Sequence, residues 1–168
     1  GTFSYSHLMT TCEAPGAIAT GDFNADGIAD LAVAGQGGGE ALVTHLGNGS
    51  NGEPDGTFAS KQTWLSGGFV AGDVLVTDMN GDQIDDLVVT LTLANCVCFL
   101  AGSGSGGRGS GNFYLDEVVG VGQRPWGLLA GDFNGDNIQD YATLSYLNAG
   151  VTLVTANGEH GRGDGTFA

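Results

Sequence analysis

The stretch GDFNADGIADLAVAG, from Gly21 to Gly35, decides how this sequence is interpreted. It places Asp22, Asn24, Asp26 and Asp30 on one alternating register, with Ile28 filling the gap, and then becomes abruptly apolar. Two later stretches repeat it, TDMNGDQIDDLVVTL and GDFNGDNIQDYATLS. Their first aspartates, Asp22, Asp78 and Asp132, are spaced by 56 and 54 residues. A constant period of this length indicates a repeat protein.

A second landmark follows the same period, because GTF, DGTF, SGNF and DGTF place phenylalanines at Phe3, Phe58, Phe113 and Phe167. The period predicts repeats at residues 1–55, 56–110 and 111–165, with residues 166–168 beginning a fourth. Each repeat holds four short apolar segments separated by turns, and the chain has 32 glycines and only 3 prolines. This pattern predicts an all-β fold of three four-stranded antiparallel blades of propeller type. Because propellers close with about 4 to 8 blades, we expect the three to belong to a larger propeller or a head-to-tail assembly.

The charge balance limits the partners that this chain can bind. Four Lys and Arg residues face 19 Asp and Glu residues, which gives a formal net charge of −15. Nucleic acids and anionic membrane surfaces would be repelled, whereas cations would be attracted. No apolar run is long enough for a membrane span, so no membrane insertion is expected. The first residues include neither Met nor a signal-like segment, which predicts a processed chain or a segment of a longer one.

The three polar loops share one set of oxygen-bearing side chains. Relative to the first aspartate, positions 1, 3, 5 and 9 carry Asp, Asn, Asp and Asp, and position 7 is always Ile, whose backbone carbonyl faces the same side. Calcium takes six to eight oxygen ligands, so the set predicts one Ca²⁺ per repeat, three in all. The predicted ligands are Asp22, Asn24, Asp26, Ile28 and Asp30; Asp78, Asn80, Asp82, Ile84 and Asp86; and Asp132, Asn134, Asp136, Ile138 and Asp140.

Other interpretations of the loops fit less well. An EF-hand needs a bidentate Glu at position 12, where this chain has Val33, Val89 or Thr143. Zinc prefers Cys or His ligands, which the loops lack. An Asx-rich turn that only supplies hydrogen bonds is the simplest alternative. Three acids crowded into each of three loops nevertheless favour a bound counterion.

The motif DFNADGIAD, followed by an apolar strand and later by GNG and DGTF, resembles the FG-GAP/VCBS repeat family. This family includes the repeats of integrin alpha-subunit propellers and of many secreted microbial proteins. The resemblance covers almost the whole chain in three copies. It implies propeller-type blades with a calcium ion in the inter-strand loop, held by the side chains named above.

Several other motifs bear on binding or catalysis. No GxSxG motif or Ser/His/Asp order is present, and three near-identical loops favour a structural role over one tuned acid–base pair, so we expect no enzyme. The tripeptide Arg162-Gly163-Asp164 is interpreted as part of the repeated turn. Trp64 and Trp126 are candidate sugar-stacking side chains, but they occupy different repeat positions, which favours packing roles.

The remaining features concern the setting of the protein. Cys12, Cys96 and Cys98 are either small buried residues or include one disulfide. Asn48 begins an Asn-Gly-Ser sequon and is a candidate glycosylation site. The glycine-rich segment 101–112 predicts a long flexible hairpin connection.

The sequence therefore predicts a non-enzymatic, calcium-binding extracellular module, secreted or at the cell surface, with a structural or adhesive role. Its expected partners are calcium ions and either copies of itself or neighbouring repeats, in a propeller or a filament. The alternatives are a carbohydrate-binding lectin-type propeller with a protein or glycan ligand, and a non-catalytic domain of a secreted hydrolase.

Overall fold

A computed structural model describes residues 8–159 and 161–167 of the chain. These residues form strands, turns and loops, with no helix among them and therefore no helix able to cross a membrane. The predicted landmark Phe3 and Ala168, within the predicted start of a fourth repeat, lie outside the described residues. The prediction of an all-β fold built from antiparallel sheets is confirmed.

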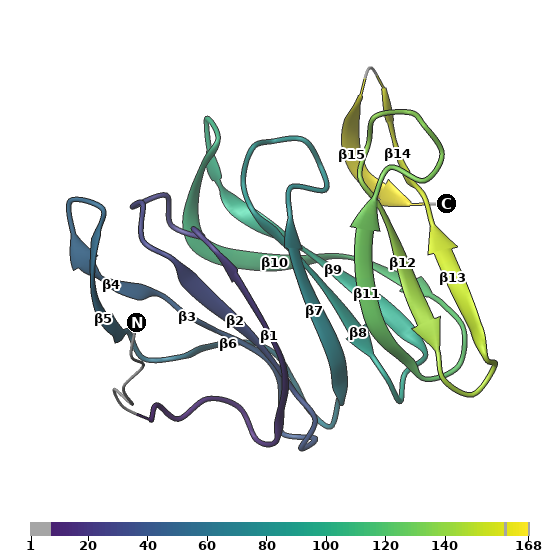
Figure 1. The fold of residues 1–168 in the computed structure, drawn as a ribbon, viewed down its shortest axis with the longest axis horizontal. Helices are drawn as coiled ribbons and strands as arrows, with labels where there is room; N and C mark the ends of the chain where they lie inside the picture. Colours follow the sequence, from purple (N-terminus) through teal and green to yellow (C-terminus); the bar gives the residue numbers. More distant parts are fainter. Residues whose placement is uncertain (1–7, 160, 168) are drawn as a thin grey trace, which may run out of the picture.

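The strands form three main sheets and two separate hairpins (Figure 1). The first sheet has the order β1-β2-β3-β6 and consists of β1 (Pro15–Gly21), β2 (Asp30–Gly35), β3 (Glu40–His45) and β6 (Gln62–Ser66). The second sheet has the order β7-β8-β9-β10 and consists of β7 (Ala71–Thr77), β8 (Asp86–Leu91), β9 (Cys96–Ser105) and β10 (Arg108–Gly120). The third sheet has the order β11-β12-β13 and consists of β11 (Pro125–Gly131), β12 (Asp140–Ser145) and β13 (Gly150–Val154). The hairpins pair β4 (Gly47–Ser50) with β5 (Glu53–Phe58), and β14 (Ala156–Glu159) with β15 (Arg162–Phe167).

The third sheet has three strands among the described residues, where the repeat pattern predicted four. The fourth strand of the first sheet, β6, follows the landmark Phe58, and the fourth strand of the second sheet, β10, contains the landmark Phe113 and continues beyond it. The equivalent residue of the third repeat, Phe167, is the last one described. The sheets lie side by side in a row, and the described residues form no closed ring (Figure 1).

The predicted repeat boundaries and the observed sheets divide the chain at different places. The boundaries after residues 55, 110 and 165 lie within β5, β10 and β15. Each sheet instead begins at β1, β7 or β11, just before an acidic loop. The sequence period therefore runs from hairpin to hairpin, whereas the sheets run from loop to loop.

Each sheet has two faces that the alternation of side chains defines. We call the face that carries Ile18, Val74 or Leu128 the leading face, and the opposite face the trailing face. In register with these residues, the leading face of the second sheet carries Val74, Val89 and Cys98, and its trailing face carries Leu75, Val88 and Phe99.

The trailing face of one sheet packs against the leading face of the next. One core cluster joins Ala32, Ala34 and Leu42 of the first sheet to Val89 and Leu100 of the second. A second cluster joins Val88, Val97 and Phe99 of the second sheet to Tyr141 and Val154 of the third. The middle sheet is therefore covered on both faces, which explains why every residue of β8 is buried.

The landmark phenylalanines bind each hairpin to the cores. Phe113 packs edge-on against Phe23 with ring centroids 5.2 Å apart, and against Trp64 at 5.4 Å. Phe167 packs in the same way against Phe99 at 5.5 Å and Tyr141 at 5.2 Å. Edge-to-face pairs of this kind add stabilisation beyond the burial of their apolar area.

The interpretation of residues 101–112 as a flexible connection was wrong. The segment continues β9 to Ser105 and resumes in β10 at Arg108, so only a two-residue turn separates the strands. The glycines lie close to other groups here: a Cβ on Gly102 or Gly104 would collide with a backbone carbonyl, of Asp85 or Arg108, and with the side chain of Ile84. Their small size, rather than flexibility, explains the composition.

The three cysteines are free thiols and all are buried. Cys12 packs with Val33 and Val43, whereas Cys96 and Cys98 lie in the cluster between the first and second sheets. Of the two interpretations left open by the sequence, the structure shows the buried apolar one.

Replacing Phe113 by Ala is expected to lower the free energy of unfolding by about 3 to 4 kcal/mol, because a buried aromatic side chain leaves a cavity. Its neighbour Tyr114 is 53% exposed, so Tyr114→Ala is the matched control and should cost less than about 1 kcal/mol. Urea unfolding followed by fluorescence measures both. Equal losses for the two variants would contradict the packing described here.

Candidate functional site

Each acidic loop folds its side chains back onto its own backbone. In the first loop both Asp22 and Asn24 accept the backbone N–H of Asp26, each at 3.1 Å. Asp22 also accepts the N–H of Gly27 at 2.9 Å, and Asp26 accepts that of Ile28 at 2.8 Å. The second and third loops repeat all four hydrogen bonds at the equivalent residues. The loops therefore have one shared geometry.

The backbone of each loop enters the left-handed region twice, at relative positions 4 and 6. In the first loop these residues are Ala25 (φ 55°) and Gly27 (φ 83°). In the other loops they are Gly81 and Gln83, and Gly135 and Asn137. This alternation turns successive N–H groups toward the carboxylate at position 1.

The aspartate at position 9 has a different role from the other three ligand positions. Asp86 accepts the N–H of Met79 at the start of its loop and the N–H of Gly102 on β9, both at 2.8 Å. Asp30 makes the same pair of bonds to Phe23 and Gly47, both at 2.7 Å. Asp140 makes them to Phe133 and Ala156, both at 2.9 Å. We call this double acceptor the aspartate staple, because it joins the start of each loop to a later strand.

All three staple carboxyls are fully buried. Burial raises the pKa of Asp86 to about 7, against the opposing effect of the N–H groups of Gly102 and Met79. Burial likewise raises the pKa of Asp30, opposed by the N–H groups of Gly47 and Phe23. The two backbone donors compensate part of the cost of removing a carboxyl from water.

The isoleucine at position 7 anchors each loop to the core. Ile28, Ile84 and Ile138 are 4%, 5% and 4% exposed. The side chain of Ile28 lies against Gly47 and Gly49 of the β4–β5 hairpin, where a Cβ on either glycine would collide with it. The loop is thus attached to the core by the apolar contact of the isoleucine and by the buried carboxyl of the aspartate staple.

The fifteen predicted ligands divide into two groups in space. Positions 1, 3 and 5 lie together at the turn, while position 9 lies below them in the core. In the part of the chain that the structure describes, no three His, Cys, Asp or Glu side chains surround a common point suited to a metal. The donors grouped at each turn are two carboxylates and one amide oxygen, with the Ile carbonyl close in sequence. They are all oxygens, the donor type that suits a hard cation.

A hairpin from the following repeat covers the first two loops. Gly111 of β10 donates its N–H to the carbonyl of Phe23 at 2.7 Å, and Arg108 donates to the carbonyl of Ala25 at 3.4 Å. Gly163 of β15 approaches the carbonyl of Met79 in the same way, and Arg162 lies against Gly81. Two of the four basic residues of the chain therefore stand over acidic loops.

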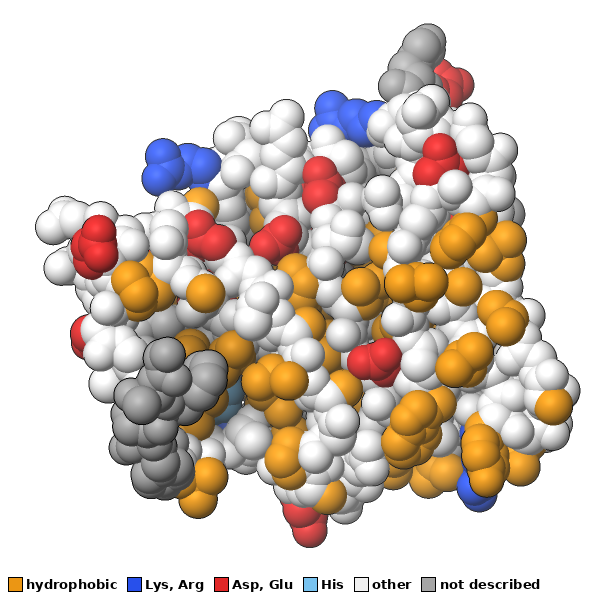
Figure 2. All heavy atoms as spheres, in the orientation of Figure 1, with side chains coloured by type: hydrophobic (Ala, Val, Ile, Leu, Met, Phe, Trp, Pro, Cys, Tyr) orange, Lys and Arg blue, Asp and Glu red, His pale blue; other side chains and the backbone are white. Residues whose placement is uncertain are grey.

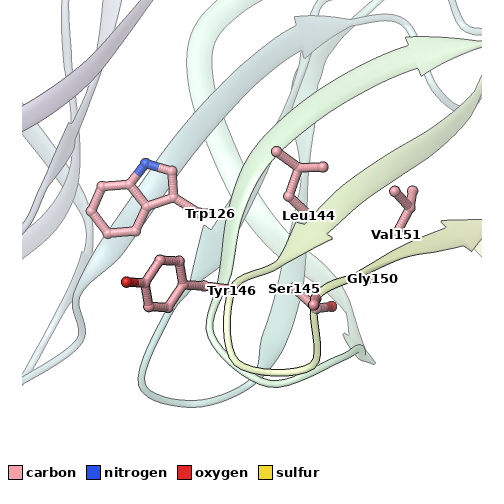
Figure 3. A pocket seen from close by; sticks show the side chains of 7 residues that line it. Trp126, Leu144, Ser145, Tyr146, Gly150 and Val151 are labelled. Carbon is pink, nitrogen blue, oxygen red and sulfur yellow. The ribbon is translucent and has the colours of Figure 1, made fainter.

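The two tryptophans lie in different environments. Trp64 packs against Phe113 and donates its indole N–H to Thr44 at 2.9 Å, which is a core position. Trp126 is 46% exposed and Tyr146 is 76% exposed. With Thr92 and Arg124 they line a hollow of about 490 Å³. An adjoining hollow extends past Leu144 and Val151 (Figure 3).

The remaining predicted motifs lie in hairpins. Asp164 accepts the N–H and hydroxyl of Thr166, as Asp55 does with Thr57, so the Arg-Gly-Asp tripeptide belongs to the repeated turn. Asn48 lies on β4 and donates its side-chain amide to Thr57 at 2.9 Å. Its glycosylation stays a prediction.

The family model of the FG-GAP-like repeat matches residues 22–89. This match spans the first two acidic loops and confirms the resemblance found in the sequence. No curated protein and no solved structure matches the chain. FG-GAP repeats are generally non-catalytic structural or adhesion-type domains and are typically extracellular.

The third loop extends the FG-GAP-like pattern beyond the matched residues. It repeats the turn hydrogen bonds and the staple of the two matched loops. Spacing alone groups position 9 with the turn ligands, because aspartate can serve either as a cation ligand or as a buried hydrogen-bond acceptor. One signal separates the two: position 9 is directly followed by the apolar strand, whereas positions 1 to 5 are not.

Replacing Asp86 by Ala is expected to lower the free energy of unfolding by about 3 kcal/mol, because two buried N–H groups lose their acceptor. Asp55→Ala is the control, since Asp55 also accepts two hydrogen bonds but is exposed; it should cost less than about 1 kcal/mol. Denaturant unfolding measures both changes. A loss at Asp86 no larger than that at Asp55 would contradict the staple.

Proposed function

We propose that the chain is a non-enzymatic, calcium-binding extracellular module with a structural or adhesive role. The observation that carries this proposal is the threefold repetition of one loop geometry, two copies of which lie in the segment that matches the FG-GAP-like repeat. A catalytic site needs two carboxyls whose surroundings differ, so that one donates a proton and the other accepts it. Three equivalent loops suit one structural task performed once per repeat.

The turn residues support calcium by their chemistry. Asp22, Asn24 and Asp26 would hold the ion in the first loop, with the carbonyl of Ile28 and water completing an oxygen shell. Asp30 already accepts two N–H groups, and each of its oxygens keeps a further lone pair. The same assignment applies to the second and third loops. A bound calcium ion would supply the positive charge that these carboxylates otherwise lack.

The chain itself prepares each loop for that charge. The staple fixes where the loop begins, and the left-handed residues set the direction of the turn. The carboxylate oxygens at the turn accept backbone N–H groups, and each oxygen keeps a further lone pair that a cation could use. Binding would then stabilise the folded chain without a large rearrangement, since a ligand bound only by the folded state raises stability.

The proposed assembly follows from the row of sheets. The middle sheet packs against a neighbouring sheet on each face, whereas the leading face of the first sheet and the trailing face of the third have no neighbouring sheet among the described residues. Head-to-tail association of copies, into a propeller or a filament, would continue the row. This arrangement suits a structural role.

Calorimetric titration is expected to show three calcium ions per chain, and calcium at a hundred times its dissociation constant should raise the free energy of unfolding by about 2.7 kcal/mol per site. Asp82→Ala should lower the stoichiometry from three to two, because one loop loses a central carboxylate. A chelator should lower the melting temperature of the wild type.

Asp116→Ala removes an exposed acid outside the loops and should leave the stoichiometry at three. An unchanged melting temperature in chelator, together with no heat of calcium binding, would contradict the calcium proposal. Loss of one ion in both variants would place the site elsewhere.

A glycan ligand is the second candidate, and the hollow at Trp126 favours it. The exposed indole and the ring of Tyr146 offer flat apolar faces, and Arg124 adds hydrogen-bond donors beside them. Trp64 does not contribute, because its indole is used in the core.

If a glycan binds here, Trp126→Ala should weaken its binding at least about tenfold, since loss of a stacked ring costs on the order of 1.4 kcal/mol or more. Leu93→Ala, another exposed apolar side chain, is the control and should leave binding unchanged. A glycan array read with both variants measures this. Glycan binding that survives Trp126→Ala would remove this site.

A further inference from the structure

The trailing face of the third sheet is an exposed apolar surface. Leu129 is 63% exposed, Leu144 55%, Val151 66% and Leu153 49%. They share one face because Leu129 and Leu153 both lie opposite Ala142, while Leu144 lies opposite Val151. Hydrophobic side chains gather over this sheet in Figure 2. Contiguous apolar surface of this kind marks an interaction site.

The equivalent faces of the other two sheets are buried by a neighbouring sheet. In the second sheet the residues at the register positions of Leu153, Val151 and Leu144 are Phe99, Val97 and Thr90, each at most 1% exposed. They are covered because β11 of the third sheet packs over β7 and β8. In the first sheet Ala32 and Ala34 are fully buried beneath β7 in the same way.

The third acidic loop is uncovered at the same side of the molecule. Phe23 and Met79, at the second position of the first and second loops, are each 1% exposed, because a hairpin of the following repeat crosses them. Phe133, the equivalent residue of the third loop, is 45% exposed. A single neighbouring repeat would therefore cover both the trailing face of the third sheet and the third acidic loop.

The opposite end of the row offers the complementary surface. At each internal junction the strand that packs over the preceding sheet is the first strand of the next one, with Val74 or Leu128 on its leading face. Val74 is 6% exposed, whereas the equivalent Ile18 on β1 is 64% exposed. Ile18 also lines a groove with Met9, Pro15 and Val33.

We propose that the trailing face of the third sheet binds the first sheet of a second copy of this chain, and that Glu53 limits the strength of that junction. The inference rests on the proposed head-to-tail association and names its two surfaces. Leu129, Leu144, Val151 and Leu153 form one surface, and Ile18 of the second copy lies at the centre of the other. The junction repeats the two that the chain already contains.

Glu53 is the point at which the new junction differs from the internal ones. It lies on β5 at the position that Arg108 holds on β10 and Arg162 holds on β15, each five residues before a landmark phenylalanine. At the internal junctions those arginines stand over an acidic loop. Between two copies, Glu53 would instead stand over Asp132 and Asp136. Like charges set against each other across an interface weaken it.

The charge reversal makes the junction between copies weaker than the internal ones and sensitive to ions. Added salt screens exposed charges, and a divalent cation at the third loop would neutralise them directly. Apolar contact thus determines where the copies meet, while the acidic loop and Glu53 determine how firmly they hold. The chain stays separate at low ionic strength and associates when cations are supplied.

Sedimentation velocity over a range of concentrations tests this proposal. Glu53→Arg is expected to lower the dissociation constant of self-association by at least about tenfold at low salt, because it replaces repulsion by attraction. Asp116→Arg makes the same change of charge at an exposed residue of the middle sheet, outside the junction, and should change the dissociation constant by less than about twofold. Added calcium should strengthen the wild type more than it strengthens Glu53→Arg.

Val151→Asp in the Glu53→Arg background should abolish association, and because Val151 is exposed in the single chain, the variant keeps its melting temperature. Association that survives this variant, or a Glu53→Arg chain that remains monomeric at every concentration, would overturn the proposal. Calcium titration of the same variants separates the two claims. Three bound ions without association would leave the calcium proposal standing and remove this one.

Discussion

The structure depends on a buried carboxylate that accepts two backbone N–H groups. Asp30, Asp86 and Asp140 each join the second residue of an acidic loop to a residue that follows the third strand of the same sheet or lies within it. A buried carboxylate without partners would be costly, and two donors make the position tolerable and specific. The hydrogen bond from the later strand connects residues up to 17 positions apart in the sequence, as between Asp30 and Gly47. It therefore sets the register of a whole repeat. Loop, strand and hairpin can therefore form only together.

That constraint explains how an acidic, glycine-rich chain presents ordered loops. The staple holds the loop from the core side, the isoleucine packs beneath it, and the turn carboxylates remain at the surface. The following repeat then crosses the loop with its own hairpin. Each repeat thus leaves one surface to be covered by the next. The trailing face of the third sheet is such a surface, and no described residues cover it. The proposed calcium sites lie in the three acidic loops, and the proposed junction between copies includes the third of these loops.

Much of this arrangement could be predicted from the sequence, and the failures have physical causes. The repeat period, the strand content and the acidic turns follow from patterns along the chain, since alternation and Asx chemistry are local. The separate role of Asp86 could not be predicted by spacing alone, because a ligand and a buried acceptor need the same side chain. The segment 101–112 was misjudged because glycine permits both flexibility and close packing, and only the contact with Ile84 distinguishes them. The contrast between Glu53 and Arg108 became meaningful once the structure showed which hairpin crosses which loop.

Amide hydrogen exchange tests directly whether the aspartate staple holds the start of each loop. The N–H groups of Phe23, Met79 and Phe133 lie at the start of loops, where exchange is ordinarily fast, yet each donates to a buried carboxylate. These three amides are expected to exchange as slowly as the strand amides of β8, and Asp86→Asn should accelerate exchange most strongly at Met79 and Gly102. Exchange at the rate of the exposed turn amides Gly27 and Asn137, in the wild type, would contradict this role of the staple.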